Sequence, residues 1–227
     1  ARPEPIPFFG ELGSINPMFL LPSALEARGV EIGTAWAGSL TMGAGQFCTN
    51  PGVAVVPEGA GADAFADAAK CSLSETGAQV MLTDGIAEAY RRGRDRVAAS
   101  AGVRSLLTST CDLRNATPYL FRTTGAAWLA DAALGEEVFG PLGLIVAVAD
   151  MAEMRAVAAG LDGQLTCTLQ MDAEDSAHAT DLMPILERKA GRILANGFPT
   201  GVEVSDAMVH GGPYPASTNF GATSVGT

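Results

Sequence analysis

Two short, fully apolar runs constrain the fold of this chain more than any other feature. Val53–Val56 is a continuous run of apolar, mostly β-branched residues, and Leu144–Val148 is a second apolar run of similar length. Runs without polar alternation are typical of strands that are buried on both faces, as in parallel sheets covered by helices. These two runs therefore predict an α/β fold.

Helix-like and further strand-like segments alternate along the rest of the chain. We expect helices over 62–70, 86–100 and from 151, and strands over 18–21, 119–124, 165–169 and 193–195. Because strands that alternate with helices form parallel sheets, we predict a three-layer α/β domain with a mostly parallel sheet covered by helices. Two further expectations are a short strand over 6–11 and a helix that ends at Gly29 before a second one over 30–42.

The composition argues against several classes of partner. The 227 residues carry a net charge of -11 and no basic cluster, so we expect neither nucleic acid nor an anionic membrane surface as a partner. No apolar run approaches the length of a membrane span and the first residues do not resemble a signal peptide, which favours a cytoplasmic protein. The four cysteines form no CxxC pair, so we expect no metal site.

The segment Gly45–Gly52 places one thiol, that of Cys48, in a loop of small residues. Gly45, Pro51 and Gly52 predict an irregular backbone around it, between a helix and a buried strand. A thiol on such a supported loop can act as a nucleophile. The alternative is a buried cysteine that packs as a small apolar side chain, and the loop alone leaves both open.

Three motifs occur in order along the chain, and together they carry a resemblance. They are Glu11-Leu12-Gly13-Ser14-x-Asn16-Pro17, Gly45-Gln46-x-Cys48-Thr49-x-Pro51-Gly52 and Glu136-Glu137-Val138-Phe139-Gly140-Pro141. The chain resembles the catalytic-domain half of the aldehyde dehydrogenase superfamily over essentially all its residues. Its closing runs, 199–204 and 210–215, are similar to the branch of α-ketoglutarate semialdehyde (2,5-dioxopentanoate) dehydrogenases and certain bacterial fatty-aldehyde dehydrogenases.

The resemblance implies catalytic roles for Cys48 and Glu11. Cys48 would attack the aldehyde carbonyl to give a thiohemiacetal, which loses hydride to a nicotinamide and becomes a thioester that water hydrolyses. Glu11 would be the general base that activates this water and helps to deprotonate the thiol. The chemistry needs a base, because a free thiol with a pKa of about 8.5 is mostly protonated at neutral pH. Without the motif, Glu11 would be an ordinary carboxylate at a strand end.

The same resemblance assigns binding roles to other residues. Those expected at the cofactor are Glu137 on the ribose hydroxyls, Phe139 beside the nicotinamide and the backbone of Leu12 on the carboxamide. Those expected at the substrate are Phe198, Thr49 and the loop over 200–204. For Phe139 the alternative is core packing. We expect His210 to form hydrogen bonds in its loop rather than to act in catalysis.

The resemblance also implies that a partner domain is missing. Family members are roughly twice as long, and their N-terminal portion supplies most of the dinucleotide site, whereas this chain has no GxGxxG motif. We therefore expect one catalytic domain over 1–227, with 1–21 as the lead-in from a missing N-terminal cofactor-binding domain, and a homo-oligomeric parent protein.

The expected cofactor of the parent is NADP or NAD, with NADP favoured by the branch, and the expected substrate is a semialdehyde such as 2,5-dioxopentanoate. The isolated chain is expected to bind the cofactor poorly and to lack redox activity. Two alternatives stay open: a cofactor-independent thiol ester hydrolase and an inactive module that keeps only the fold.

Overall fold

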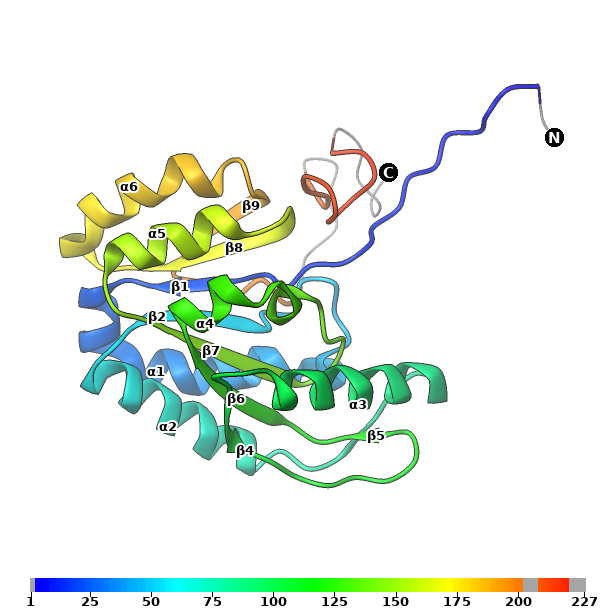
Figure 1. The fold of residues 1–227 in the computed structure, drawn as a ribbon, viewed down its shortest axis with the longest axis horizontal. Helices are drawn as coiled ribbons and strands as arrows, with labels where there is room; N and C mark the ends of the chain where they lie inside the picture. Colours follow the sequence, from blue (N-terminus) through cyan, green and yellow to red (C-terminus); the bar gives the residue numbers. More distant parts are fainter. Residues whose placement is uncertain (1–2, 202–207, 221–227) are drawn as a thin grey trace.

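The computed structural model describes residues 3–201 and 208–220. Its main sheet has seven strands in the order β4-β6-β7-β2-β1-β8-β9 (Figure 1). These strands are β1 (Met18–Leu20), β2 (Val53–Pro57), β4 (Arg104–Leu107), β6 (Tyr119–Thr124), β7 (Leu142–Val148), β8 (Gln164–Gln170) and β9 (Ala190–Ala195). All neighbouring pairs are parallel except β4 and β6. Strands β3 (Gln79–Val80) and β5 (Asn115–Ala116) form a separate antiparallel pair.

Helices cover both faces of the main sheet, which gives three layers (Figure 1). One face is covered by α1 (Pro22–Thr41) and α2 (Ala60–Ser74), and the other by α3 (Asp84–Ala99), α4 (Gly125–Ala130), α5 (Met151–Gly160) and α6 (Ser176–Leu186). Short 3-10 turns are η1 (Met42–Gly45), η2 (Ala132–Gly135) and η3 (Ala173–Asp175). The predicted fold class is confirmed. No helix within the described ranges is long and apolar enough to cross a membrane.

The central strands contribute to two separate cores, one on each face of the sheet. On β2, Val53 and Val55 belong to the core beneath α3 to α6, whereas Ala54 and Val56 belong to the core beneath α1 and α2. All four residues are almost completely buried. Burial of a valine side chain contributes about 1.5 kcal/mol or more, so an apolar residue is favoured at every position of the strand. This explains the run without polar alternation.

Gly29 does not end a helix, contrary to the expectation from the sequence. Helix α1 continues through it from Pro22 to Thr41. A Cβ atom at Gly29 would lie 3.5 Å from the carbonyl oxygen of Gly61, and one at Gly33 would lie 2.5 Å from that of Phe65. These glycines therefore let α1 pack closely against α2.

The expected strand over 6–11 is also absent from the structure. Within residues 3–201 and 208–220, its only β-type pairing is an isolated antiparallel bridge between Glu11 and Ser217. Pro3, Pro5 and Pro7 supply no backbone N–H donors, and this explains why the segment approaches the sheet as an extended lead-in without joining a ladder.

Candidate active site

The loops that carry the three motifs meet at the amino ends of parallel strands. Residues 11–17 precede β1, the Cys48 loop precedes β2, and residues 136–141 precede β7. Because β1, β2 and β7 are parallel neighbours, their amino ends lie at one edge of the sheet. Doubly wound folds instead bind ligands at the carboxyl ends of their strands, so the candidate site lies at the opposite edge.

The backbone before Cys48 follows the irregular path that its small residues predict. Gly43, Ala44 and Gly45 all have positive φ, at 56°, 59° and 67°. A Cβ atom at Gly45 would lie 2.3 Å from the carbonyl carbon of Gly140, so only glycine fits against that turn. The loop therefore leaves Cys48 half-buried on a tightly constrained backbone.

Asn16 holds the Cys48 loop in place through hydrogen bonds to its backbone. It is completely buried, and its Nδ2 donates hydrogen bonds to the carbonyl oxygens of Cys48 at 2.8 Å and Asn50 at 3.0 Å. Its Oδ1 accepts one from Thr166 Oγ1 at 3.0 Å. Its φ of 47° is a conformation that asparagine tolerates better than most residues. Asn16 thus ties the entry to β1, the nucleophile loop and β8 together.

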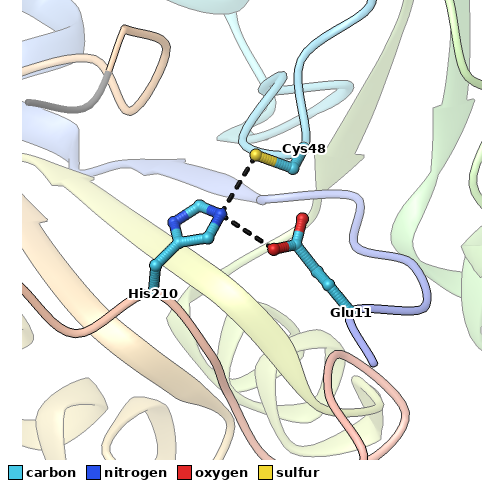
Figure 2. Close-up of side chains that lie close together, drawn as sticks. All are labelled: Glu11, Cys48 and His210. Atoms are coloured by element: carbon cyan, nitrogen blue, oxygen red, sulfur yellow. Dashed lines mark hydrogen bonds and ion pairs between the residues drawn. The ribbon is translucent and has the colours of Figure 1, made fainter. Parts of the chain in front are cut away.

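Glu11, Cys48 and His210 converge at this edge of the sheet (Figure 2). The Cys48 Sγ lies 3.1 Å from His210 Nε2, and the same nitrogen lies 2.9 Å from Glu11 Oε2. His210 is 3% exposed, and the side chain of Glu11 is 21% exposed. The structure therefore brings together the two residues predicted to be catalytic. His210, which the sequence assigned only to loop hydrogen bonding, contacts both of them.

Two glycines make room for the segment that carries His210. A Cβ atom at Gly191 would lie 1.8 Å from the carbonyl oxygen of Gly211, and one at Gly163 would lie 1.9 Å from that of Pro213. The segment over 210–213 therefore packs backbone to backbone against the entries to β8 and β9. This contact places the imidazole over the sheet edge.

Residues 216–218, which follow that segment, position Glu11. The backbone N–H of Leu12 donates to the carbonyl oxygen of Ala216 at 3.0 Å, and that of Thr218 donates to Gly10 at 2.8 Å. This short antiparallel pairing explains how two residues from opposite ends of the chain reach the same thiol. No local sequence pattern predicts it, because Cys48 and His210 are 162 positions apart.

The surroundings of Cys48 hold the thiol in its protonated form. Burial, followed by the neighbouring Glu11 carboxylate, raises the pKa of Cys48 to about 11. Arg192 on β9 supplies a nearby positive charge, although burial lowers its own pKa and the interaction with Cys48 raises it only in part. Reaction of this thiol at neutral pH therefore requires a base, and Glu11 is hydrogen-bonded to it.

The residues expected at the cofactor lie beside this cluster. Leu12 is 51% exposed and lines a pocket of about 260 Å³ together with Glu137. Glu137 also lines a second, smaller cavity with Phe139, which is partly buried. Although Glu137 is an exposed residue, the burial of its carboxyl group raises its pKa to about 7; the Ser14 N–H opposes this rise and Glu11 adds to it.

The residues expected at the substrate are adjacent to each other. Thr49 is buried, and its hydroxyl donates to the carbonyl oxygen of Pro199 at 2.8 Å. Phe198 is partly buried and packs against the core beneath α1 and α2. Thr49 thus holds the segment that carries Phe198, and contact of either residue with a substrate stays a prediction. Of the loop over 200–204, positions 202–204 lie outside the described residues.

Comparison with known proteins extends these observations beyond the single chain. The chain is 51% identical over 231 residues to α-ketoglutaric semialdehyde dehydrogenase 2 of Azospirillum brasilense. It is 42% identical over 229 residues to α-ketoglutaric semialdehyde dehydrogenase of Acinetobacter baylyi. The resemblance to the aldehyde dehydrogenase superfamily is confirmed. Both alignments include the whole chain, which spans 43% and 44% of the length of these relatives. No protein-family model matches the chain.

Solved aldehyde dehydrogenases share the fold. A glyceraldehyde-3-phosphate dehydrogenase of Methanocaldococcus jannaschii, solved with NADP, gives a TM-score of 0.72 at 21% identity and covers 91% of this chain and 44% of its own. A methylmalonate-semialdehyde dehydrogenase of Oceanimonas doudoroffii gives 0.70 at 16% identity, with coverage of 91% and 43%. This chain therefore has an aldehyde dehydrogenase catalytic-domain fold, as the sequence predicted.

Proposed function

We propose that a protein carrying this chain is an NAD(P)-dependent dehydrogenase that oxidises an aldehyde to a carboxylic acid, with α-ketoglutaric semialdehyde (2,5-dioxopentanoate) as its substrate. The observation that carries this proposal is the contact of Cys48 Sγ, His210 Nε2 and the Glu11 carboxylate at one edge of the sheet. The names of the two relatives support this choice of substrate. The resemblance to the branch of α-ketoglutarate semialdehyde dehydrogenases favours NADP as the cofactor.

Cys48 begins the reaction once its proton has moved to Glu11. The proton on His210 Nε2 can be donated to the Glu11 carboxylate while the thiol is intact, and to the thiolate after the transfer, because Nε2 lies within 3.1 Å of both groups. The thiolate then forms a bond to the aldehyde carbon. The carbonyl electron pair moves to oxygen, where the backbone N–H of Cys48 donates a hydrogen bond.

A nicotinamide cofactor, when bound, would supply the hydride acceptor that converts the thiohemiacetal on Cys48 into a thioester. The residues that would hold its reactive end are Glu137, Leu12 and Phe139. Their fit rests on the Glu137 carboxyl group, which is shared between two pockets and can accept hydrogen bonds from ribose hydroxyls in its ionised form. Glu11 releases the thiol proton to solvent and, as a carboxylate again, takes a proton from water. The resulting hydroxide attacks the thioester, the C–S bond breaks, and the departing Cys48 thiolate regains a proton from Glu11.

A cofactor-independent ester hydrolase is the second candidate function. Nucleophilic attack by Cys48 and activation of water by Glu11 suffice to cleave an activated ester. This function requires only groups that the chain itself brings together, whereas the chain has no GxGxxG motif for a dinucleotide. Residues 1–227 would then form one catalytic domain whose ester cleavage does not depend on the nucleotide-binding half.

A chimaera tests the two functions together. The chain replaces the matching part of the Azospirillum relative, and the purified hybrid is assayed with 2,5-dioxopentanoate and with NADP or NAD. The expected result is cofactor reduction that Cys48→Ala lowers by about a thousandfold or more, while the matched variant Cys71→Ala keeps it. A folded hybrid that cleaves 4-nitrophenyl acetate through Cys48 but does not oxidise the aldehyde would contradict the dehydrogenase function and favour the hydrolase.

A further inference from the structure

The cluster of Glu11, Cys48 and His210 presents three different metal-binding atoms. The Cys48 sulfur, a His210 ring nitrogen and a Glu11 carboxylate oxygen all lie within 4.8 Å of one another. Thiolate, imidazole and carboxylate are the three ligand types that bind zinc in proteins. The spacing of the cysteines could not reveal this set, because its members come from three distant segments.

The distances in the cluster are close to those that a tetrahedral ion requires. With zinc bonds of about 2.3 Å to sulfur and about 2.0–2.1 Å to nitrogen and oxygen, the expected S···N and N···O separations are about 3.6 and about 3.4 Å. The observed separations are 3.1 and 2.9 Å. An outward shift of about 0.5 Å at each pair would admit the ion, and water could fill the fourth position.

Access and charge also suit a cation. Cys48 is half-buried and the Glu11 side chain is 21% exposed, whereas His210 is buried and fixed. An ion can therefore approach from the side of the sulfur and the carboxylate. Arg192 is the cation that interacts with Cys48 among the described residues, and the two negative charges of a thiolate and a carboxylate outweigh it.

We propose that Glu11, Cys48 and His210 form a Zn²⁺ site that blocks the nucleophile. The ion takes the place of the thiol proton, which is released to solvent, and His210 binds through Nε2 with its ring proton on Nδ1. A thiolate whose electron pair is shared with zinc attacks carbonyl carbon poorly, so the occupied site is an inhibited state. The binding claim itself does not depend on the proposed dehydrogenase function.

The test uses the whole chain with Cys71 and Cys111 replaced by serine, so that the other accessible thiols cannot bind the ion. Calorimetry with ZnCl₂ is expected to show one equivalent bound. Addition of CoCl₂ instead is expected to produce the visible absorption of tetrahedral cobalt and a sulfur-to-metal charge-transfer band. Zinc is also expected to protect Cys48 from iodoacetamide, and EDTA to restore alkylation.

Three variants locate the ligands. His210→Ala and Glu11→Gln are each expected to weaken binding about tenfold or more, while His178→Ala, at the other histidine of the chain, leaves it unchanged. Circular dichroism checks that each variant is folded. If His210→Ala does not fold, Glu11→Gln still tests the proposal, because it preserves side-chain volume. Absence of stoichiometric binding, unprotected Cys48 in the presence of zinc, or equal affinity in all three variants would overturn the proposal.

Discussion

In the proposed mechanism, the movement of the thiol proton depends on one nitrogen atom. His210 Nε2 lies between the Cys48 sulfur and the Glu11 carboxylate, so its hydrogen bond can follow the movement of the thiol proton. The sequence identified Cys48 and Glu11 through their motifs, but it assigned His210 only to its loop. Only a contact across the fold shows that this histidine reaches the thiol.

Glu137→Gln is predicted to change how stability depends on pH. The pKa of Glu137 is raised from 4.5 to about 7, chiefly by burial of its carboxyl group, so the folded chain binds more protons than the unfolded chain between these values. The free energy of unfolding of the wild type therefore falls as pH rises through this window. Urea titrations at several pH values are expected to show that the variant becomes the more stable form above about pH 7.

Glu136→Gln is the control for that prediction. Glu136 is the preceding carboxylate in the chain; its side chain is 60% exposed and pairs with Arg96 at 2.8 Å. The stability advantage is expected for Glu137→Gln and not for this variant. The same pH trend in both variants would contradict the assignment of the effect to the buried carboxyl group.

Backbone contacts between elements set the positions of these side chains. Gly163, just before β8, and Gly191, the second residue of β9, accept the 210–213 segment against bare backbone. Ala216 and Thr218, which follow that segment, pair with residues 10–12. At this scale a glycine has two possible meanings in a sequence. Gly29 permits close packing between α1 and α2, although a glycine at this point of the sequence predicts the end of a helix.

Gly191→Ala is predicted to displace His210. Its Cβ atom would lie 1.8 Å from the carbonyl oxygen of Gly211, and a backbone contact cannot be relieved by a change of rotamer. We expect the variant to lose about 1–3 kcal/mol of stability, as measured by urea denaturation.

Gly38→Ala is the matched control. Gly38 lies within α1, and its added Cβ atom would meet no atom within 4 Å. We therefore expect this variant to be more stable by about 0.5–1 kcal/mol, as measured by urea denaturation. If both variants stabilise the chain, the conclusion that the 210–213 segment packs closely against Gly191 is wrong.

The whole molecule shows which parts of a fold a sequence predicts. The apolar runs at β2 and β7 and the α/β alternation depend on burial, which local composition records, and the structure confirms both. The expected strand over 6–11 and the helix end at Gly29 are wrong because strand pairing and helix packing depend on distant neighbours. For the site, the motifs of the family supplied Cys48 and Glu11, whereas His210 required the three-dimensional arrangement.

The chain alone is predicted to bind NADP weakly. It spans less than half the length of its curated relatives, and Leu12, Glu137 and Phe139 would contact only the nicotinamide end of the cofactor. Fluorescence titration of the chain with NADP is expected to show no saturation at micromolar concentrations, while the chimaera binds. Micromolar affinity of the chain itself would contradict this prediction.

The measurement that tests the central claim most directly is the pH dependence of alkylation at each cysteine. The folded chain is treated with limiting iodoacetamide and EDTA over pH about 7 to about 10, and the label is mapped for the wild type and Glu11→Gln. If Cys48 and Glu11 act as one unit, Cys48 reacts much more slowly than the exposed Cys71 near neutral pH, and its rate is still rising at the alkaline end because its pKa is about 11. Glu11→Gln removes the neighbouring negative charge and shifts this profile to lower pH. A Cys48 profile that matches that of Cys71 and does not respond to Glu11→Gln would contradict the account.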